Sequence, residues 1–168
     1  MAISQFNLDN GQRAERKLLI TVAEWDEGGT PVREVLGTRT EDSSIEYNAD
    51  ISTTTDILGN NYTDINRTQP QQDFDPYLVL GGSKLGAKLN DIRKRNALSE
   101  LNAFTMYIIT AFVGTAGAYE AEKHEDCTIT YNSFGGDSNV NFPISVYFSN
   151  KITNGTVDKL ADDFTFTA

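Results

Sequence analysis

Histidine and cysteine are almost missing from this sequence, which contains one of each among its 168 residues, His124 and Cys127. A single cysteine excludes a disulfide bond within the chain, and a histidine-based metal site or catalytic triad would have to be built around His124 alone. Carboxylates flank His124 on both sides, so we expect a solvated side chain there. Cys127 begins an apolar alternation with Ile129 and Tyr131, which is typical of a small buried residue rather than of a reactive thiolate.

Long apolar runs and an excess of positive charge are missing as well. The most apolar stretch, Phe104–Val113, is about half as long as the ~20 residues of a membrane helix, so we expect no membrane partner. The chain carries 14 basic and 24 acidic side chains, for a formal net charge of −10. Sequence-specific nucleic-acid binders normally carry a basic patch that neutralises phosphates, so that class of protein is not expected.

The charges that are present fall into two groups. Residues 24–64 hold ten acids against two arginines, whereas basic residues concentrate between Lys84 and Arg95. Two interpretations stay open at this point. Either both groups are simply solvated surface, or an acidic patch of one subunit meets a basic patch of another.

Signatures of catalysis are also lacking. The segment Leu80–Gly86 is rich in glycine and precedes a helix, but it has neither spacing of a phosphate-binding loop. Ser133 lacks the preceding glycine of a hydrolase elbow. Paired carboxylates such as Glu41 and Asp42 stand in polar turns rather than in the apolar surroundings that acid–base chemistry needs. We therefore expect no catalytic residue, no metal site and no cofactor, and the chain is not predicted to be an enzyme.

Strand patterns dominate the rest of the sequence, because apolar, β-branched and aromatic residues alternate or cluster between turn signals. The predicted strands are Lys17–Ala23, Val32–Leu36, Ser43–Asn48, Thr53–Leu58, Tyr62–Asn66, Phe104–Val113, Tyr119–Tyr131 and Val140–Phe148. The turn at residues 59–61 predicts a hairpin, whose threonines favour a half-buried sheet with one wet face. In the last strand, alternate apolar residues from Val140 to Phe148 are expected on one face, and Pro143 indicates an edge or a bulge.

One helix is expected after Ser83, which is a suitable N-cap. Leu85, Leu89 and Ile92 recur at helical spacing and predict its buried face, with charged residues on the opposite face. The predicted fold class is mostly β, with two packed antiparallel β-sheets (a sandwich or barrel) and one flanking α-helix in a single domain of residues 1–168.

Three segments have little of their own to bury. Residues 1–10 have no clear periodicity and are expected to form an N-terminal arm. The Gln- and Pro-rich stretch 68–76 is expected to be extended and to lean on another surface, such as that of a neighbouring subunit. Residues 164–168 are expected to form a C-terminal arm or a short strand.

Several runs of this sequence are similar to the major tail (tail-tube) proteins of long-tailed, non-contractile bacteriophages and prophages of Gram-positive bacteria. The runs that carry the resemblance are Glu41–Asp50, Thr54–Asn66, Gln69–Pro76, Asp91–Leu98, Gly117–Glu122, Phe134–Asp137, Tyr147–Asn150 and Gly155–Val157. They cover the chain roughly from Glu41 to its end. No single motif among them is chemically diagnostic, so the resemblance rests on the whole pattern.

The resemblance implies a tail-tube fold and a structural role in the virion. In that family, subunits assemble as stacked hexameric rings around a lumen that conducts DNA during genome ejection. The implied partners are other copies of the chain, the tape-measure and terminator proteins, and DNA in transit without specific binding. The implied location is the virion tail, after assembly in the host bacterial cytoplasm.

Within this picture, two sets of residues are candidates for function. The candidates for an acidic lumen surface, which would repel DNA, are Glu46, Asp50, Asp56 and Asp64. The candidates for contacts between rings are Ile3, Phe6, Leu8, Pro70, Phe74, Pro76 and Phe166.

Other classes of function compete with this one. Within the tube class, the nearest alternative is the tube protein of a contractile tail or of a secretion system. A β-sandwich carbohydrate-binding or adhesion module is a second alternative, in which Trp25, Tyr62 or Tyr119 would stack on sugars. An enzyme with a site built from carboxylates alone is the third.

Overall fold

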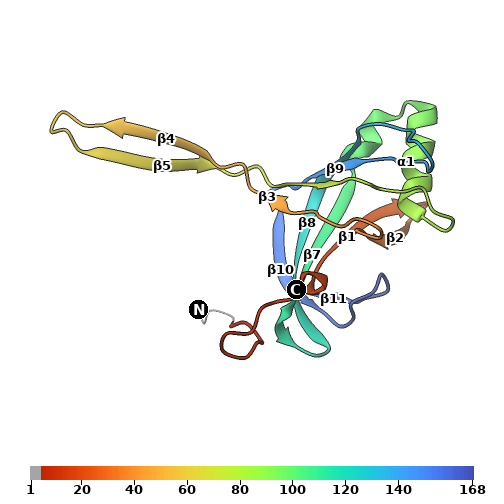
Figure 1. Ribbon diagram of the computed structural model, residues 1–168, viewed down its shortest axis with the longest axis horizontal. Coiled ribbons are helices and arrows are strands. Elements are labelled where there is room, and N and C mark those ends of the chain that lie inside the picture. Colours follow the sequence, from red (N-terminus) through yellow and green to blue (C-terminus); the bar gives the residue numbers. More distant parts are fainter. Residues whose placement is uncertain (1–4) are drawn as a thin grey trace.

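The computed structural model of the protein describes residues 5–168. Strands make up most of its regular structure, and one helix of 12 residues accompanies them. Figure 1 shows a body built on one large sheet with helix α1 at one end, and a long two-stranded hairpin that projects away from the body. The predicted fold class, mostly β with antiparallel sheets and one flanking helix, is confirmed.

The strands follow the order that the sequence patterns indicate. They are β1 Leu19–Glu27, β2 Thr30–Val35, β3 Ile45–Glu46, β4 Asp50–Thr55, β5 Asn61–Arg67, β6 Gln71–Phe74, β7 Phe104–Thr115, β8 Ala118–Tyr131, β9 Ile144–Tyr147, β10 Ile152–Val157 and β11 Phe166–Thr167. Helix α1 spans Lys84–Arg95, and short 3₁₀ turns lie at Arg16–Leu18 and Leu98–Asn102. Each predicted strand overlaps an observed one, whereas β6 and β10 are not among the predicted strands.

The large sheet has nine strands and is organised by the long strand β8. Its path runs β2-β1-β7-β8-β9-β6-β3, with β10 also on β8 and β11 on β10. Residues 119–124 of β8 pair with β10, and residues 128–131 of the same strand pair with β9. The sheet therefore has two halves that share β8, one containing β1 and β7, the other containing β6 and β9.

The two halves face each other across a common core. Phe104 and Met106 of β7 and Ile144 and Val146 of β9 belong to one cluster of buried side chains, together with the buried face of α1. At the open end of this arrangement, the hydroxyl of Thr21 on β1 donates a hydrogen bond of 2.8 Å to Gln72 Oε1 on β6. Both side chains are buried, so the halves are joined by polar as well as apolar contacts.

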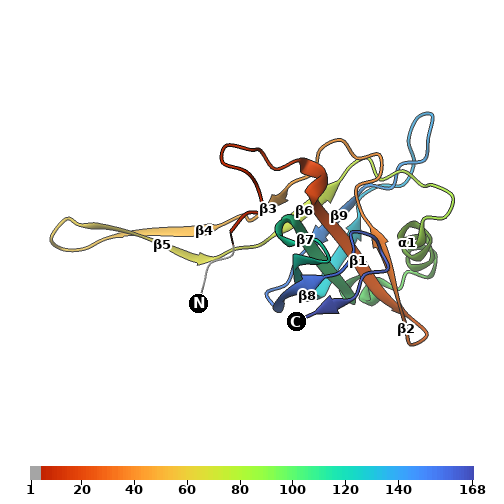
Figure 2. The same ribbon diagram turned by 90° about the horizontal axis from the view of Figure 1, so that it is seen from below.

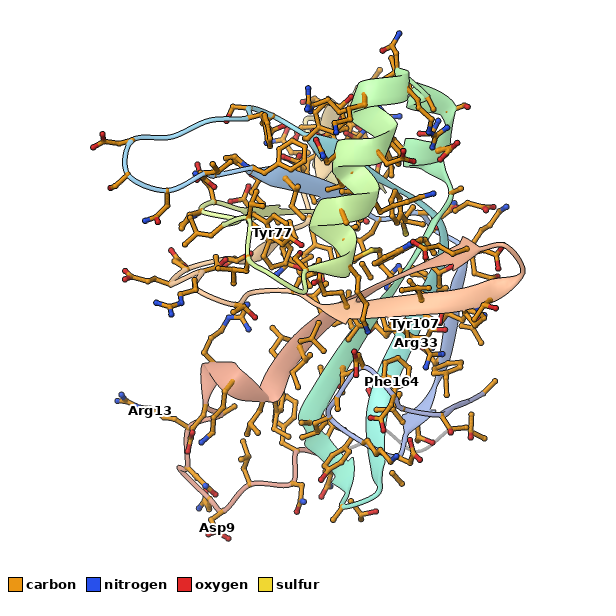
Figure 3. All side chains as sticks on the ribbon, turned by 90° about the vertical axis from the view of Figure 1, so that its right-hand side faces the viewer. Asp9, Arg13, Arg33, Tyr77, Tyr107 and Phe164 are labelled. Atoms are coloured by element: carbon orange, nitrogen blue, oxygen red, sulfur yellow. The ribbon has the colours of Figure 1, made fainter. Side chains whose placement is uncertain are left out.

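The outer face of β1 and β7 is covered by the C-terminal segment. Tyr107 and Phe164 lie in a second buried cluster, with their ring centroids 4.9 Å apart. Arg33 of β2 lies against both rings, as Figure 3 shows, and its Nη1 donates to the backbone oxygen of Phe164 at 2.5 Å. β1 and β7 are thus covered on both faces, which agrees with the apolar residues that their sequences place on both faces.

Helix α1 follows its predicted form. Ser83 is the N-cap, and its hydroxyl accepts a hydrogen bond from the Gly86 amide at 3.2 Å. Leu85, Leu89 and Ile92 are fully buried, as their spacing predicts. The helix ends at Asn96 in the left-handed region, with φ of 51°.

The segment 68–76 is extended over residues 71–74, as predicted, but the surface that it packs against belongs to its own chain rather than to a neighbouring subunit. Its central part is β6, which is an interior strand between β3 and β9. Phe74 is 2% exposed in the core of its own chain. Gln72 is 1% exposed, and its buried side-chain oxygen accepts a hydrogen bond from the Thr21 hydroxyl. Sequence patterns do not predict a buried Gln72, because its hydrogen-bond partner Thr21 is 51 residues away in the sequence.

The segment 140–148 is only partly the predicted strand. β9 begins at Ile144, immediately after Pro143, which has no amide hydrogen to donate to a ladder. Phe142, Ile144, Val146 and Phe148 are buried on one face, as predicted. Val140 is exposed instead, because it precedes the first residue of β9 and lies outside the sheet.

The chain ends differ from each other. Residues 166–167 form the short strand β11 on β10, so the strand alternative for this segment is the correct one. At the other end, the Asn7 amide donates to the Phe112 oxygen at 2.7 Å, and Phe6 forms a single β-bridge with Val113. Phe6 remains 68% exposed, and Leu8 is the only half-buried residue among residues 5–10. Ile3 lies outside the described residues.

Candidate assembly surface

The β4–β5 hairpin is the feature of the fold that no intramolecular packing explains. Its strands pair with each other and with no other strand of residues 5–168. In Figures 1 and 2 the hairpin extends well beyond the body and touches it only at its base. Its two strands lie side by side, so the paired part reaches about 20 Å, since a strand rises roughly 3.4 Å per residue.

The hairpin has two chemically different faces. Ile51 lies opposite Ile65, and Thr53 lies opposite Thr63 on the same face. The other face presents Tyr62, Asp64 and their partners, because successive side chains of a strand point to opposite sides. Both faces are exposed, including the two isoleucines. The prediction of a half-buried hairpin with one wet face is therefore wrong for the isolated chain.

The tip of the hairpin is a tightly ordered turn organised by Asp56. The Asp56 carboxylate accepts hydrogen bonds from the amides of Leu58 and Asn60 at 2.8 and 2.9 Å. It also accepts from the Asn60 side chain at 3.0 Å and from the Tyr62 hydroxyl at 3.1 Å. Gly59 takes a φ of 83°, which a residue without a Cβ adopts at no steric cost.

This turn displays two aliphatic side chains outward. Ile57 is 102% exposed and Leu58 is 81% exposed, although both are among the most hydrophobic side chains of the hairpin. Polar groups inside the turn are satisfied, so its shape does not depend on burying these two residues. Exposed aliphatic pairs on a fixed turn are typical of an anchor for another surface.

The hydrogen bonds at the tip are expected to change the pKa of the Asp56 carboxyl. Donation by Asn60, first from its side chain and then from its amide, lowers the pKa of the Asp56 carboxyl. A lowered pKa means that the turn is fully stabilised above the ordinary value of about 4 and is loosened as pH falls through the lower folded value. Asn60→Ala is expected to raise the pKa of Asp56, measured by NMR of the carboxyl carbon, and Asn66→Ala to leave it unchanged. An unmoved Asp56 in Asn60→Ala would contradict this account of the turn.

The structure places three of the four acidic candidates on the hairpin. Asp50, Asp56 and Asp64 all belong to the hairpin, whereas Glu46 lies on β3 near its base. Asp64 points to the face opposite the isoleucines, and Asp50 lies 3.8 Å from the guanidinium of Arg67. Asp56 is directed into its own turn.

The candidates for contacts between rings do not form one surface. Phe74 is buried in the core, so its side chain offers no surface to another ring. Leu8, Pro70, Pro76 and Phe166 are half-buried against their own chain, and Phe166 packs 5.6 Å from Tyr107. Phe6 is the most exposed of the described candidates. Ile57 and Leu58 are not among the predicted contact residues. An aliphatic pair inside a turn is the sequence feature that could have indicated them.

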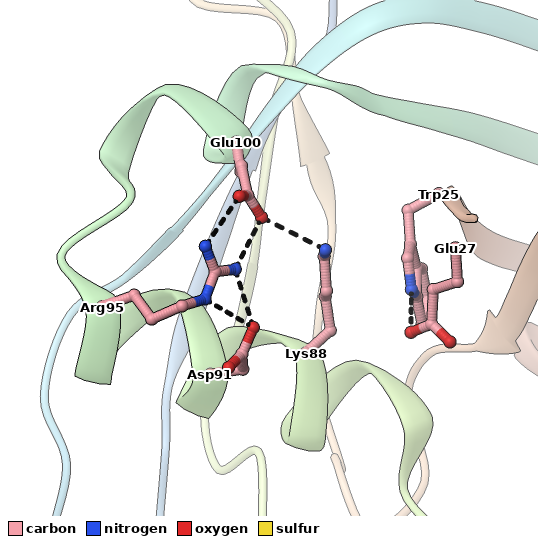
Figure 4. Close-up of polar contacts among 6 residues, drawn as sticks. All are labelled: Trp25, Glu27, Lys88, Asp91, Arg95 and Glu100. Atoms are coloured by element: carbon pink, nitrogen blue, oxygen red, sulfur yellow. Dashed lines mark hydrogen bonds and ion pairs between the residues drawn. The ribbon is translucent and has the colours of Figure 1, made fainter. Parts of the chain in front are cut away.

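The charged face of α1 is partly neutralised within the chain. Arg95 binds both Asp91 and Glu100, and Lys88 reaches Glu100 at 3.2 Å (Figure 4). These bonds, those from Arg95 first, lower the pKa of Glu100 to about 2. In the same view Trp25 donates to Glu27 and is buried, so it cannot stack on a sugar.

The backbone amides that follow the glycine-rich segment, at the start of α1, are already occupied by a carboxylate of the same chain. Glu34 of β2 places its carboxylate at the helix N-terminus, where it accepts from the amides of Lys84 and Leu85 at 3.1 and 3.2 Å. The Tyr77 hydroxyl donates to the same carboxylate at 2.7 Å. The Glu34 carboxylate therefore takes the place at these amides that a bound anion would need.

His124 corrects another prediction, because it is 3% exposed rather than solvated. Its Nδ1 lies 3.2 Å from the Ser149 oxygen and its Nε2 lies 3.1 Å from the Glu122 carboxylate. Local sequence shows the carboxylates but not Phe148, whose ring packs edge-on against His124 with centroids 5.2 Å apart. Cys127 is buried as predicted, and burial raises the pKa of its thiol.

Neither a metal centre nor a membrane segment is evident in the part of the chain that the structure describes. Among residues 5–168, no group of three or more His, Cys, Asp or Glu side chains is arranged to hold a metal ion. Across the same residues, no helix has the length and apolar character that crossing a bilayer requires.

Comparisons with known proteins return similar structures only. No family model matches the chain, and no curated protein matches it. One similar structure is a chain of the sheath-tube complex of an extracellular contractile injection system, PVC, in its extended state. It is 15% identical, with 88% of this chain and 94% of that chain covered and a TM-score of 0.48. The PVC sheath/tube terminator is 15% identical over 85% of this chain and 96% of its own, with a TM-score of 0.49. The cap that terminates the tube of the anti-feeding prophage is 15% identical over 93% of this chain and 99% of its own, with a TM-score of 0.49.

Proposed function

We propose that this chain is a structural, non-enzymatic subunit of a phage-like tail tube, which assembles as stacked hexameric rings around a lumen that conducts DNA. The observation that carries the proposal is the projecting β4–β5 hairpin, which has no partner strand within residues 5–168. A two-stranded hairpin alone is marginally stable in water, so an arm of this length calls for a second surface to cover it.

The exposed apolar side chains of the hairpin support the same role. Five large ones are exposed on this single arm, namely Ile51, Ile57, Leu58, Tyr62 and Ile65. Soluble monomers rarely present such residues contiguously, and an exposed group of them marks an interaction site. Because the arm extends away from its own body, a second copy of the chain is the partner that a homopolymeric tube supplies.

The two faces of the hairpin suit a position at the wall of a lumen. The face with Ile51 and Ile65 would lie on a neighbouring subunit, and the face with Asp50 and Asp64 would look into the channel. Carboxylates there would repel DNA phosphates, so that DNA passes without adhering. Glu46 on β3 would extend this acidic surface toward the base of the arm.

A free sheet edge supports closure into a ring. β11 pairs only with Thr156 and Val157 of β10, so the outer edge of residues 152–155 has no partner strand among the described residues. Ile152 is half exposed on this edge. Open edges template pairing with other chains, and a ring that joins sheets of neighbouring subunits removes them.

Electron microscopy of the purified full-length protein tests the proposal. Negative-stain images are expected to show rings with six-fold symmetry and hollow tubes built from them. Monodisperse monomers at high protein concentration would overturn the proposal. Tubes that are recovered from producing cells inside a second protein layer would favour the contractile-tail alternative over a non-contractile one.

A further inference from the structure

We propose that the hairpin tip of one copy, Ile57 and Leu58, inserts into an apolar groove beside α1 of the next copy. This inference rests on the proposed function, because it names the contact that the projecting arm makes. The groove is lined by Val79, Leu80, Ala87, Asn90, Phe134 and Phe142 together with small residues at the start of α1, and encloses about 280 Å³.

The groove is apolar and open to an incoming side chain. Val79, Leu80 and Phe134 are each between two-fifths and one-half exposed, although their side chains are large and hydrophobic. Ala87 lies on the exposed side of α1 and contributes only a methyl group, which leaves space above it. These are the properties of a pocket that receives aliphatic anchors.

The groove has a fixed wall. The Phe134 ring packs edge-on to Phe142 with centroids 4.8 Å apart, and Phe142 is fully buried. On the other side of Phe134, the Arg93 guanidinium lies 4.5 Å from the ring centroid. Phe134 is thereby held between the core and a helix side chain, so the groove is formed before any partner arrives.

Charge matches the tip to this groove. Helix α1, which forms one side, carries five basic residues and one acidic residue, and it stays net positive after Glu100 and Asp162 pair with three of its basic residues. The hairpin, residues 50–67, carries three acids and one base, Arg67, which lies at its foot beside Asp50. The approach of the acidic arm to the basic helix is therefore attractive, and the aliphatic pair at the end of the arm fits the apolar lining.

The positions of the two features make the contact intermolecular. The hairpin and α1 lie at opposite ends of the molecule in Figure 1, so a tip cannot reach the groove of its own chain. Two different surfaces that meet in this way form a heterologous interface, which closes into a ring or continues into a stack. Both kinds of assembly are parts of a tube.

Disulfide trapping between two variants tests the contact. Copies that carry Leu58→Cys are mixed with copies that carry Ala87→Cys, assembled and then oxidised. Non-reducing electrophoresis is expected to show a cross-linked dimer, because a disulfide requires Cα atoms about 4.4–6.8 Å apart. The matched control replaces Ala87→Cys with Gln12→Cys, an exposed position far from the groove, and is expected to give no such dimer. The native Cys127 is fully buried and does not compete.

The outcomes separate this inference from the proposed function. Rings or tubes without a disulfide between the tip and the groove would overturn the inference, while the tube proposal would stand. A wild-type protein that forms neither rings nor tubes would overturn both. As a second readout, Leu58→Ser is expected to raise the critical concentration for assembly about tenfold or more, whereas Thr54→Ser leaves it unchanged. An unchanged critical concentration in Leu58→Ser would also count against the contact.

Discussion

Replacing residues 51–66 by Asn-Gly is expected to give a folded chain that no longer forms rings or tubes. Asp50 and Arg67 lie opposite each other in the hairpin register, so a two-residue turn can join them without moving the body. The removed side chains belong to neither buried cluster of the body, and the free energy of unfolding is expected to change by less than about 1 kcal/mol.

The loss of assembly is expected to be large. Full burial of each isoleucine or leucine of the arm contributes roughly 1.5–3 kcal/mol, and every 1.4 kcal/mol changes an association constant tenfold. Sedimentation velocity and negative-stain images of the shortened and parent proteins measure the effect. The control variant Thr53→Ser/Thr63→Ser keeps the full hairpin and is expected to assemble like the parent. Tubes of normal diameter from the shortened protein would show that the hairpin is not the assembly arm.

The hairpin also shows how far sequence patterns reach. Alternation along β4 and β5 and the turn at Gly59 predict the hairpin correctly. Its exposure on both faces could not be predicted, because an alternating strand has the same pattern whether its apolar face meets its own chain or another. The Asp56 turn is local and could have been recognised from Asp56 and Asn60. The exposure of Ile57 and Leu58 on this turn could not, because it depends on where the rest of the chain lies.

The errors elsewhere have a common physical origin. Gln72 and His124 are polar residues that long-range contacts bury, through Thr21 on β1 and through Phe148 and Ser149. Single-sequence patterns assign polar residues to the surface because burial without a hydrogen-bond partner is costly. Where a distant element supplies the partner, that assignment fails. Local features were predicted well by comparison, as the Ser83 cap and the three buried positions of α1 show.

The candidate site shows the same difference between local features, which sequence predicts, and long-range contacts, which it does not. Sequence charge separated an acidic region from a basic helix, and both exist in the structure. The structure adds that Arg95 and Lys88 are paired internally, while Arg93 supports Phe134. A basic run in sequence thus divides into residues that stabilise the fold and one that shapes a groove. That distinction depends on side-chain directions in three dimensions, which composition does not carry.

Phe74→Ala is expected to destabilise the fold by about 3–5 kcal/mol, the usual cost of truncating a buried phenylalanine. Phe74 is 2% exposed and lies among core side chains from both halves of the sheet, so the cavity would open where the halves meet. Chemical denaturation below the assembly concentration measures the change as a shift in the midpoint at constant slope. Leu58→Ala is the matched control, since Leu58 is 81% exposed, and its effect is expected to stay within about 0.5 kcal/mol. A Phe74→Ala protein that has normal stability but forms no tubes would contradict this account. It would indicate that Phe74 contacts another ring and that β6 does not lie between β3 and β9.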